Sequence, residues 1–152
     1  MNTVLALLVI QAVVNVPAYS PPAALPPVTD VGRLSVVVAT TVSETDPQPL
    51  CDRPDCTSLF LSRYRDARTL AGPAVEPEFS ARVEMGSPWN MSYRLALIVE
   101  ERPGQERLVR AMAGFNQRTG QACFESHHTR PLNWTPEGAG LSHSTGSICV
   151  TE

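Results

Sequence analysis

Apolar residues occupy every second position in two segments of the chain, and this period predicts strands that place one face in a core. In residues 79–85 the alternation puts four apolar residues on one face and leaves Arg82 and Glu84 on the face toward water. Residues 93–101 repeat the pattern. Residues 34–41 are dense in β-branched side chains, which favour a further strand.

Two other segments fit either a strand or a helix. In residues 57–71 apolar side chains recur at helical spacing between a threonine and a glycine that suit the two ends of a helix, but the same residues also divide between two strand faces. We favour the strand, because a turn-rich break leads from this segment directly into residues 79–85. Residues 106–115 follow the turn dipeptide Pro103-Gly104, so a hairpin is expected, with a helix as the alternative.

About six short strands separated by turn residues predict an all-β domain, or a β-rich domain with one short helix. The antiparallel sheet is expected either to close into a small barrel or to form a sandwich. The final strands, residues 122–124 and 148–150, are short. Between them, residues 127–146 are rich in Pro, Gly, Asn and Ser and are expected to be mostly loop.

Three stretches carry a resemblance to a known group: SLFLSRYRDARTLAGP (58–73), FSARVEMGSP (79–88) and YRLALIVEE (93–101). In strand order and turn placement, residues 34–113 resemble small exported bacterial proteins with an OB-like barrel, and are similar in outline to its netrin-like, metalloproteinase-inhibitor version. The resemblance implies a small antiparallel OB-like barrel. The inhibitor motif needs a cysteine at the mature N-terminus, where this chain has none, so protease inhibition is not implied.

The first 20 residues contain no charged side chain, and residues 4–16 are apolar apart from Gln11 and Asn15. A helix of that length spans roughly 20 Å, too little for a hydrocarbon core of about 30 Å. The pattern is typical of a secretory signal with Ala18-Tyr19-Ser20 as its cleavage site, although no Lys or Arg precedes the apolar run. The alternative is an apolar strand or helix in the core of a cytosolic domain.

These features predict three regions: a signal peptide over residues 1–20, a Pro-rich linker over residues 21–32, and one β-rich domain over residues 33–152. No later segment is apolar for long enough to span a bilayer, so the mature chain is expected to be an exported protein, periplasmic or secreted. All twelve basic residues are Arg, which indicates a GC-rich, bacterial source.

The predicted export would place the four cysteines in an oxidising compartment. An even number of cysteines there indicates disulfides. Three connectivities are open. Proximity in sequence favours Cys51–Cys56 and Cys123–Cys149. The formal net charge of −3 gives no concentrated basic field, so nucleic-acid binding is not expected.

Binding candidates are the bulky or soft side chains near predicted loops. Aromatic residues concentrate binding energy, so Trp89 and Trp134 are candidate anchors, and His127 and His143 flank the second of them. The alternative is that the two tryptophans close the two ends of the barrel. The loop around Trp134 is the expected binding surface because it is long and irregular.

Catalytic and metal chemistry have less support. Ser142-His143-Ser144 places hydroxyls beside an imidazole, but neighbours in sequence seldom reach the geometry of a nucleophile and its base. His127 and His128, if they lie on a strand, point to opposite faces, and a disulfide would consume the thiolates of Cys51 and Cys56. We therefore expect no catalytic residue, no metal and no cofactor.

The sequence favours a periplasmic binding or envelope-accessory module whose partner is a protein or another envelope ligand. The alternative is a secreted hydrolase, protease inhibitor or metal-binding protein that uses residues 127–146.

Overall fold

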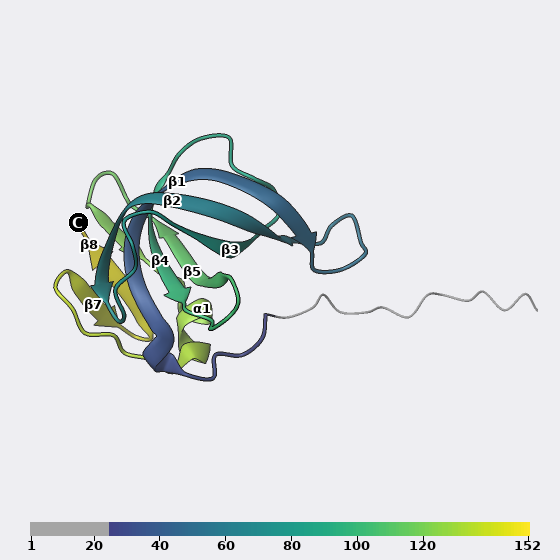
Figure 1. The fold of residues 1–152 in the computed structure, drawn as a ribbon. Coiled ribbons are helices and arrows are strands. Elements are labelled where there is room, and N and C mark those ends of the chain that lie inside the picture. Colours follow the sequence, from purple (N-terminus) through teal and green to yellow (C-terminus); the bar gives the residue numbers. More distant parts are fainter. Residues whose placement is uncertain (1–24) are drawn as a thin grey trace, which may run out of the picture.

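Five of the eight strands in residues 25–152 close into a barrel, and the other three form a small sheet beside it (Figure 1). The computed structural model describes residues 25–152, so the predicted signal peptide lies outside the described residues. The elements in chain order are η1 (Val31–Arg33), β1 (Leu34–Pro49), β2 (Ser58–Ala71), β3 (Phe79–Met85), β4 (Arg94–Glu100), β5 (Arg107–Gly114), β6 (Gln121–Cys123), α1 (Ser126–Thr129), η2 (Arg130–Leu132), β7 (Leu141–Ser144) and β8 (Ser147–Thr151).

The predicted fold class is confirmed: the chain is β-rich with one short α-helix, and the barrel order β1-β2-β3-β5-β4 is consistent with an OB-like fold. Both ambiguous segments are strands. β2 pairs antiparallel with β1 and β3, and β5 forms the predicted hairpin with β4. A short parallel contact between β3 and β5 closes the barrel through two residue pairs, Ala81↔Arg107 and Arg82↔Leu108.

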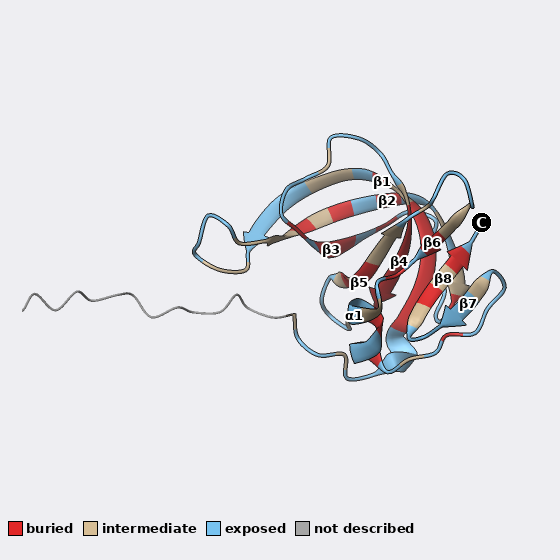
Figure 2. Ribbon diagram, turned by 180° about the vertical axis from the view of Figure 1, so that it is seen from behind, coloured by how far each residue is buried: buried red, intermediate tan, exposed pale blue. Residues whose placement is uncertain are grey.

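The first part of β1, residues 34–39, and β4 are buried on both faces and are mostly apolar, whereas the outer part of β1 is polar and exposed (Figure 2). On β1, Val37 belongs to the cluster that fills the barrel, whereas Val36 and Val38 belong to a second cluster. This second cluster includes Phe124, Ile148 and Val150 from the region of the small sheet. The small sheet therefore covers the outer face of the barrel at β1 and β4.

Arg82 contradicts the alternation in β3, which predicted that this side chain faces water. Its side chain is only 8% exposed. The guanidinium forms ion pairs with Asp46 (2.5 Å) and Glu106 (2.6 Å) and donates a hydrogen bond to the carbonyl oxygen of Asp46 (2.7 Å). The outer part of β1 and the β4–β5 loop thus cover this face of β3, a tertiary arrangement that the period of two does not encode.

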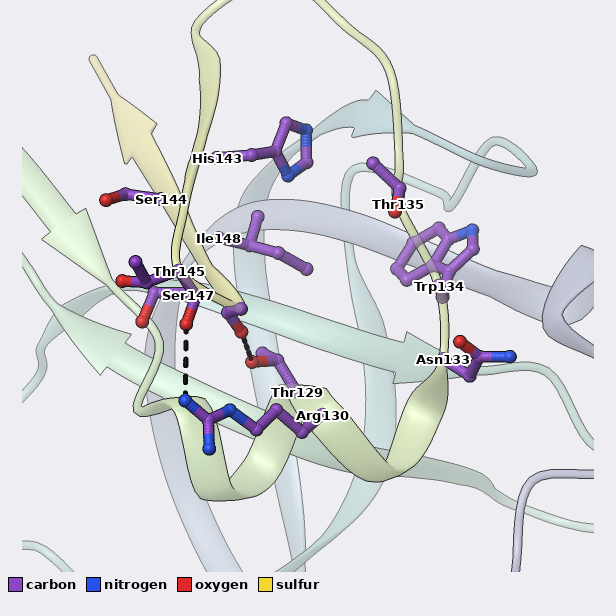
Figure 3. A pocket seen from close by; sticks show the side chains of 11 residues that line it. Thr129, Arg130, Asn133, Trp134, Thr135, His143, Ser144, Thr145, Ser147 and Ile148 are labelled. Carbon is purple, nitrogen blue, oxygen red and sulfur yellow. Dashed lines mark hydrogen bonds between the residues drawn. The ribbon is translucent and has the colours of Figure 1, made fainter.

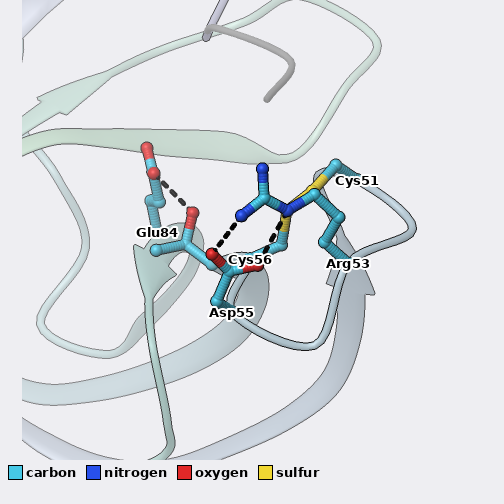
Figure 4. The surroundings of a disulfide bond; sticks show 6 residues. Cys51, Arg53, Asp55, Cys56 and Glu84 are labelled. Carbon is cyan, nitrogen blue, oxygen red and sulfur yellow. Dashed lines mark hydrogen bonds and ion pairs between the residues drawn. A yellow bond between two sulfur atoms is a disulfide. The ribbon is translucent and has the colours of Figure 1, made fainter. Parts of the chain in front are cut away.

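The β1–β2 hairpin projects beyond the barrel (Figure 1), since β4 pairs with β1 only as far as Thr40. A disulfide between Cys51 and Cys56 closes the loop at its tip, as the sequence predicted. Within this loop Arg53 Nε donates to Asp55 Oδ1 at 3.0 Å (Figure 4). The charges of Arg53 and Asp55 are therefore paired within the loop.

The small sheet has the order β6-β8-β7, and the predicted disulfide Cys123–Cys149 joins residues that lie opposite each other on β6 and β8. Residues 127–146 were predicted to be mostly loop, but half of them belong to α1, η2 and β7. These elements are only three or four residues long. Such short elements depend on tertiary contacts rather than on their own sequence period.

Candidate functional site

A cavity of about 350 Å³ lies between the α1–η2 segment and the β7–β8 hairpin (Figure 3). It is lined by apolar, hydroxyl, amide, imidazole and guanidinium groups, from Thr129, Arg130, Asn133, Trp134, Thr135, His143, Ser144, Thr145, Gly146, Ser147 and Ile148. Its volume falls at the small end of the range of roughly 300–1,000 Å³ found for ligand sites. The cavity therefore suits a compact ligand.

The β7–β8 turn fixes one wall of the cavity. Thr145 and Gly146 form a two-residue connection with φ values of 44° and 84°, the left-handed backbone that hairpins of this length require. The hydroxyl of Thr129 donates to the carbonyl oxygen of Gly146 at 2.6 Å, and a guanidinium nitrogen of Arg130 lies 3.4 Å from the carbonyl oxygen of Thr145. α1 and η2 thereby hold the hairpin tip in place.

Trp134 enters the cavity wall because η2 ends in a left-handed residue, Asn133 (φ 45°), which redirects the chain. The indole is partly buried and packs against the cluster between barrel and small sheet. His143, on β7, accompanies it on the cavity wall (Figure 3). Its Nε2 lies 2.8 Å from the carbonyl oxygen of Pro136. Ile148 is 3% exposed and adds apolar surface to the same cavity.

Arg130 supplies positive charge at the cavity. Within residues 25–152, no carboxylate forms an ion pair with its side chain, whereas Arg82, Arg107 and Arg110 each have at least one acidic partner. A guanidinium offers several fixed donors that match the oxygens of a carboxylate, sulfate or phosphate. The cavity thus combines an aromatic surface, hydroxyl donors and a cation.

The structure brings two of the predicted binding residues together, Trp134 and His143, and places the other two elsewhere. His127 lies on α1 but does not line the cavity. Sequence reasoning missed Thr129, Arg130 and Asn133 as lining residues. Their positions follow from short helical turns for which the sequence carries no periodic signal.

Trp89 lines a separate pocket with Val42, Glu44 and Met91. It packs against the cluster inside the barrel. Its ring and that of Tyr93 are in an edge-to-face arrangement, with ring centroids 5.0 Å apart. Partial burial raises the pKa of Glu44, and a hydrogen bond from the backbone of Trp89 opposes that shift. The two tryptophans therefore belong to different clusters and different sites.

A comparison of the chain with protein-family models, curated proteins and solved structures finds no match. In the described part of the chain, none of the helices has the length and apolar character needed to traverse a bilayer.

Proposed function

We propose that this protein is an exported binding module that captures an acidic sugar unit of the bacterial envelope in the cavity beside Trp134. The observation that carries the proposal is that Trp134 and Arg130 line the same cavity, and Arg130 forms no ion pair with a carboxylate of residues 25–152. A sugar ring offers an apolar C–H face to an indole and hydroxyls to polar side chains, and its carboxylate would pair with the guanidinium.

Export is part of the proposal. Two disulfides are typical of proteins in oxidising compartments, and the uncharged apolar segment at residues 1–20 has the pattern of a signal peptide. The closed five-stranded barrel is consistent with the OB-like part of the resemblance. A periplasmic module of this kind meets acidic saccharides as components of its surroundings.

The chain contains only two tryptophans, so a Trp89→Phe variant makes Trp134 the single indole reporter. Titration of this variant with D-glucuronate or N-acetylmuramate is expected to change the Trp134 fluorescence in a saturable manner. D-glucose and N-acetylglucosamine, which lack the acidic group, are expected to bind at least about tenfold more weakly, since hydrogen bonds to charged groups contribute roughly 1.5–3 kcal/mol.

Arg130→Gln in the Trp89→Phe background is expected to weaken binding of the acidic sugars by about tenfold or more. Arg118→Gln is the matched control, because it makes the same charge change at an exposed turn residue that does not line the cavity. Equal affinities in the two variants, or no saturable response to either acidic sugar, would show that the cavity does not bind this class of ligand.

A further inference from the structure

A second group of side chains with ligand chemistry lies at the start of α1, outside the cavity. Glu125, His127 and His128 each offer one ligand atom, and these three atoms lie within 4.8 Å of one another. Glu125 Oε2 is 3.1 Å from His127 Nδ1, and the two imidazole rings have centroids 3.9 Å apart. All three residues are exposed.

The two histidines converge because they lie on a helical turn rather than on a strand. Successive residues of an α-helix are about 100° apart around the axis, whereas successive strand residues point to opposite faces. The sequence-based argument against a metal assumed a strand at this point. Glu125 stands at the N-cap of α1, yet its side chain makes no capping hydrogen bond, and its carboxylate contacts the His127 imidazole instead.

The spacing of these atoms suits a first-row transition ion. Ligand bonds of about 2.0–2.2 Å place neighbouring ligand atoms of a tetrahedral Zn²⁺ site about 3.3–3.6 Å apart. The Glu125–His127 separation of 3.1 Å is slightly shorter than that edge, so a small rotation of the side chains brings the two atoms to it. Rotation of exposed side chains brings the third ligand atom in from 4.8 Å at most. Imidazole nitrogen with one carboxylate favours Zn²⁺ or Cu²⁺ over Mg²⁺ and Ca²⁺, which prefer all-oxygen sites.

The backbone that carries these ligands is anchored on both sides. The hydroxyl of Thr129 donates to the carbonyl oxygen of Gly146, and the backbone N–H of Arg130 donates to the carbonyl oxygen of Ser126. The Cys123–Cys149 disulfide lies two positions before Glu125 in the chain. Anchored ligands lose less conformational entropy when a metal binds, which favours affinity.

We propose that Glu125, His127 and His128 form a surface site for one divalent transition-metal ion. Zn²⁺ is the ion used to test the site. Three protein ligands leave the fourth tetrahedral position open to water or to a donor from another molecule. The site is independent of sugar capture, because none of its three ligands lines the cavity beside Trp134. It adds a metal-binding activity to the proposed function.

The test is competition for Zn²⁺ between a chromophoric chelator and the full chain, purified without a polyhistidine tag and with both disulfides intact. We expect one Zn²⁺ per chain. Loss of a group that merely orients a ligand already weakens metal binding by about tenfold or more, so His127→Gln and His128→Gln are each expected to weaken it by at least about tenfold. Glu125→Gln is expected to weaken it in the same direction.

His143→Gln is the matched control, since His143 is the third and last histidine of the chain and lies on β7, in the cavity wall. This variant is expected to bind Zn²⁺ like the parent. The disulfides exclude the cysteine thiolates as an alternative source of binding, because all four cysteines are paired. No competition with the chelator by the parent chain, or equal affinities in all variants, would overturn the proposal.

Near-ultraviolet circular dichroism of each variant verifies the fold, because the substituted side chains are exposed and support no core packing. The Trp134 fluorescence titration with D-glucuronate separates the two proposals. Loss of Zn²⁺ binding in His127→Gln with an unchanged sugar response is expected. A parent chain that binds Zn²⁺ but no acidic sugar would refute the sugar proposal and leave the metal site standing.

Discussion

Replacing Cys123 and Cys149 together with serine is expected to destabilise the protein by about 3.5 kcal/mol, the value that the chain-entropy relation gives for this loop. The bond spans 26 positions in sequence, so its removal restores much freedom to the unfolded chain. Domains of this size have total stabilities of about 5–15 kcal/mol, which makes the loss a large share. Urea unfolding of parent and variant, followed by far-ultraviolet circular dichroism, measures the difference.

The Cys51–Cys56 pair provides an internal comparison. Its separation is only five positions, so the same relation predicts a loss of about 2 kcal/mol for the double serine variant. The two disulfides also differ in their relation to the cavity beside Trp134. Cys149 follows Ile148 of the cavity wall, and Trp134 fluorescence in the Trp89→Phe background is therefore expected to change only when the Cys123–Cys149 bond is removed. A greater loss of stability on removal of the Cys51–Cys56 bond would contradict this account.

The barrel strands were predictable where apolar and polar residues alternate along the chain. Residues 79–85 alternate cleanly, and β3 occupies these residues. β2 was harder, because its apolar residues fit a helix as well, and the neighbouring strands decided the matter. On β1 the sequence Val36-Val37-Val38 indicated a strand. It did not show that the two faces of the strand pack in different clusters, because a strand buried on both faces has no alternation of apolar and polar residues.

The candidate site was predictable only in part. Trp134 and His143 were chosen because aromatic and imidazole groups in an irregular segment often bind ligands, and the structure brings both to one cavity. Arg130 carried no comparable signal among twelve arginines. What distinguishes it is its place in the cavity lining and the carbonyl oxygen of Thr145 near its guanidinium, and both are tertiary facts.

The burial of charged side chains in the barrel could not be predicted from the sequence pattern either. Arg82 and Glu100 occupy strand positions that sequence patterns assign to solvent or to a strand end, yet both residues are buried. Each is compensated by an oppositely charged group from another strand or loop. Burial of these charges is tolerable only because the partners are present, and substitution of one partner tests this dependence.

Glu100→Gln is expected to destabilise the protein by about 3 kcal/mol or more, because it leaves the Arg110 guanidinium buried without a counter-charge. The two side chains are only 8% and 6% exposed, and Arg110 Nε donates to Glu100 Oε2 at 2.8 Å. Arg110 also donates to the carbonyl oxygen of Pro26 at 2.6 Å, so the chain before η1 is expected to loosen as well. Urea unfolding measures the loss.

The adjacent residue supplies the control for this prediction. Glu101→Gln makes the same charge change, but the Glu101 side chain is 51% exposed and its partner Arg107 keeps a second acidic contact with Glu76. Its removal is expected to cost less than about 1 kcal/mol. The double variant Glu100→Leu/Arg110→Met removes both buried charges and is expected to recover most of the stability lost in Glu100→Gln, since apolar replacement of a buried pair is often neutral. If the double variant were less stable than Glu100→Gln, the attraction between the two charges, rather than the penalty of an uncompensated one, would be the dominant contribution.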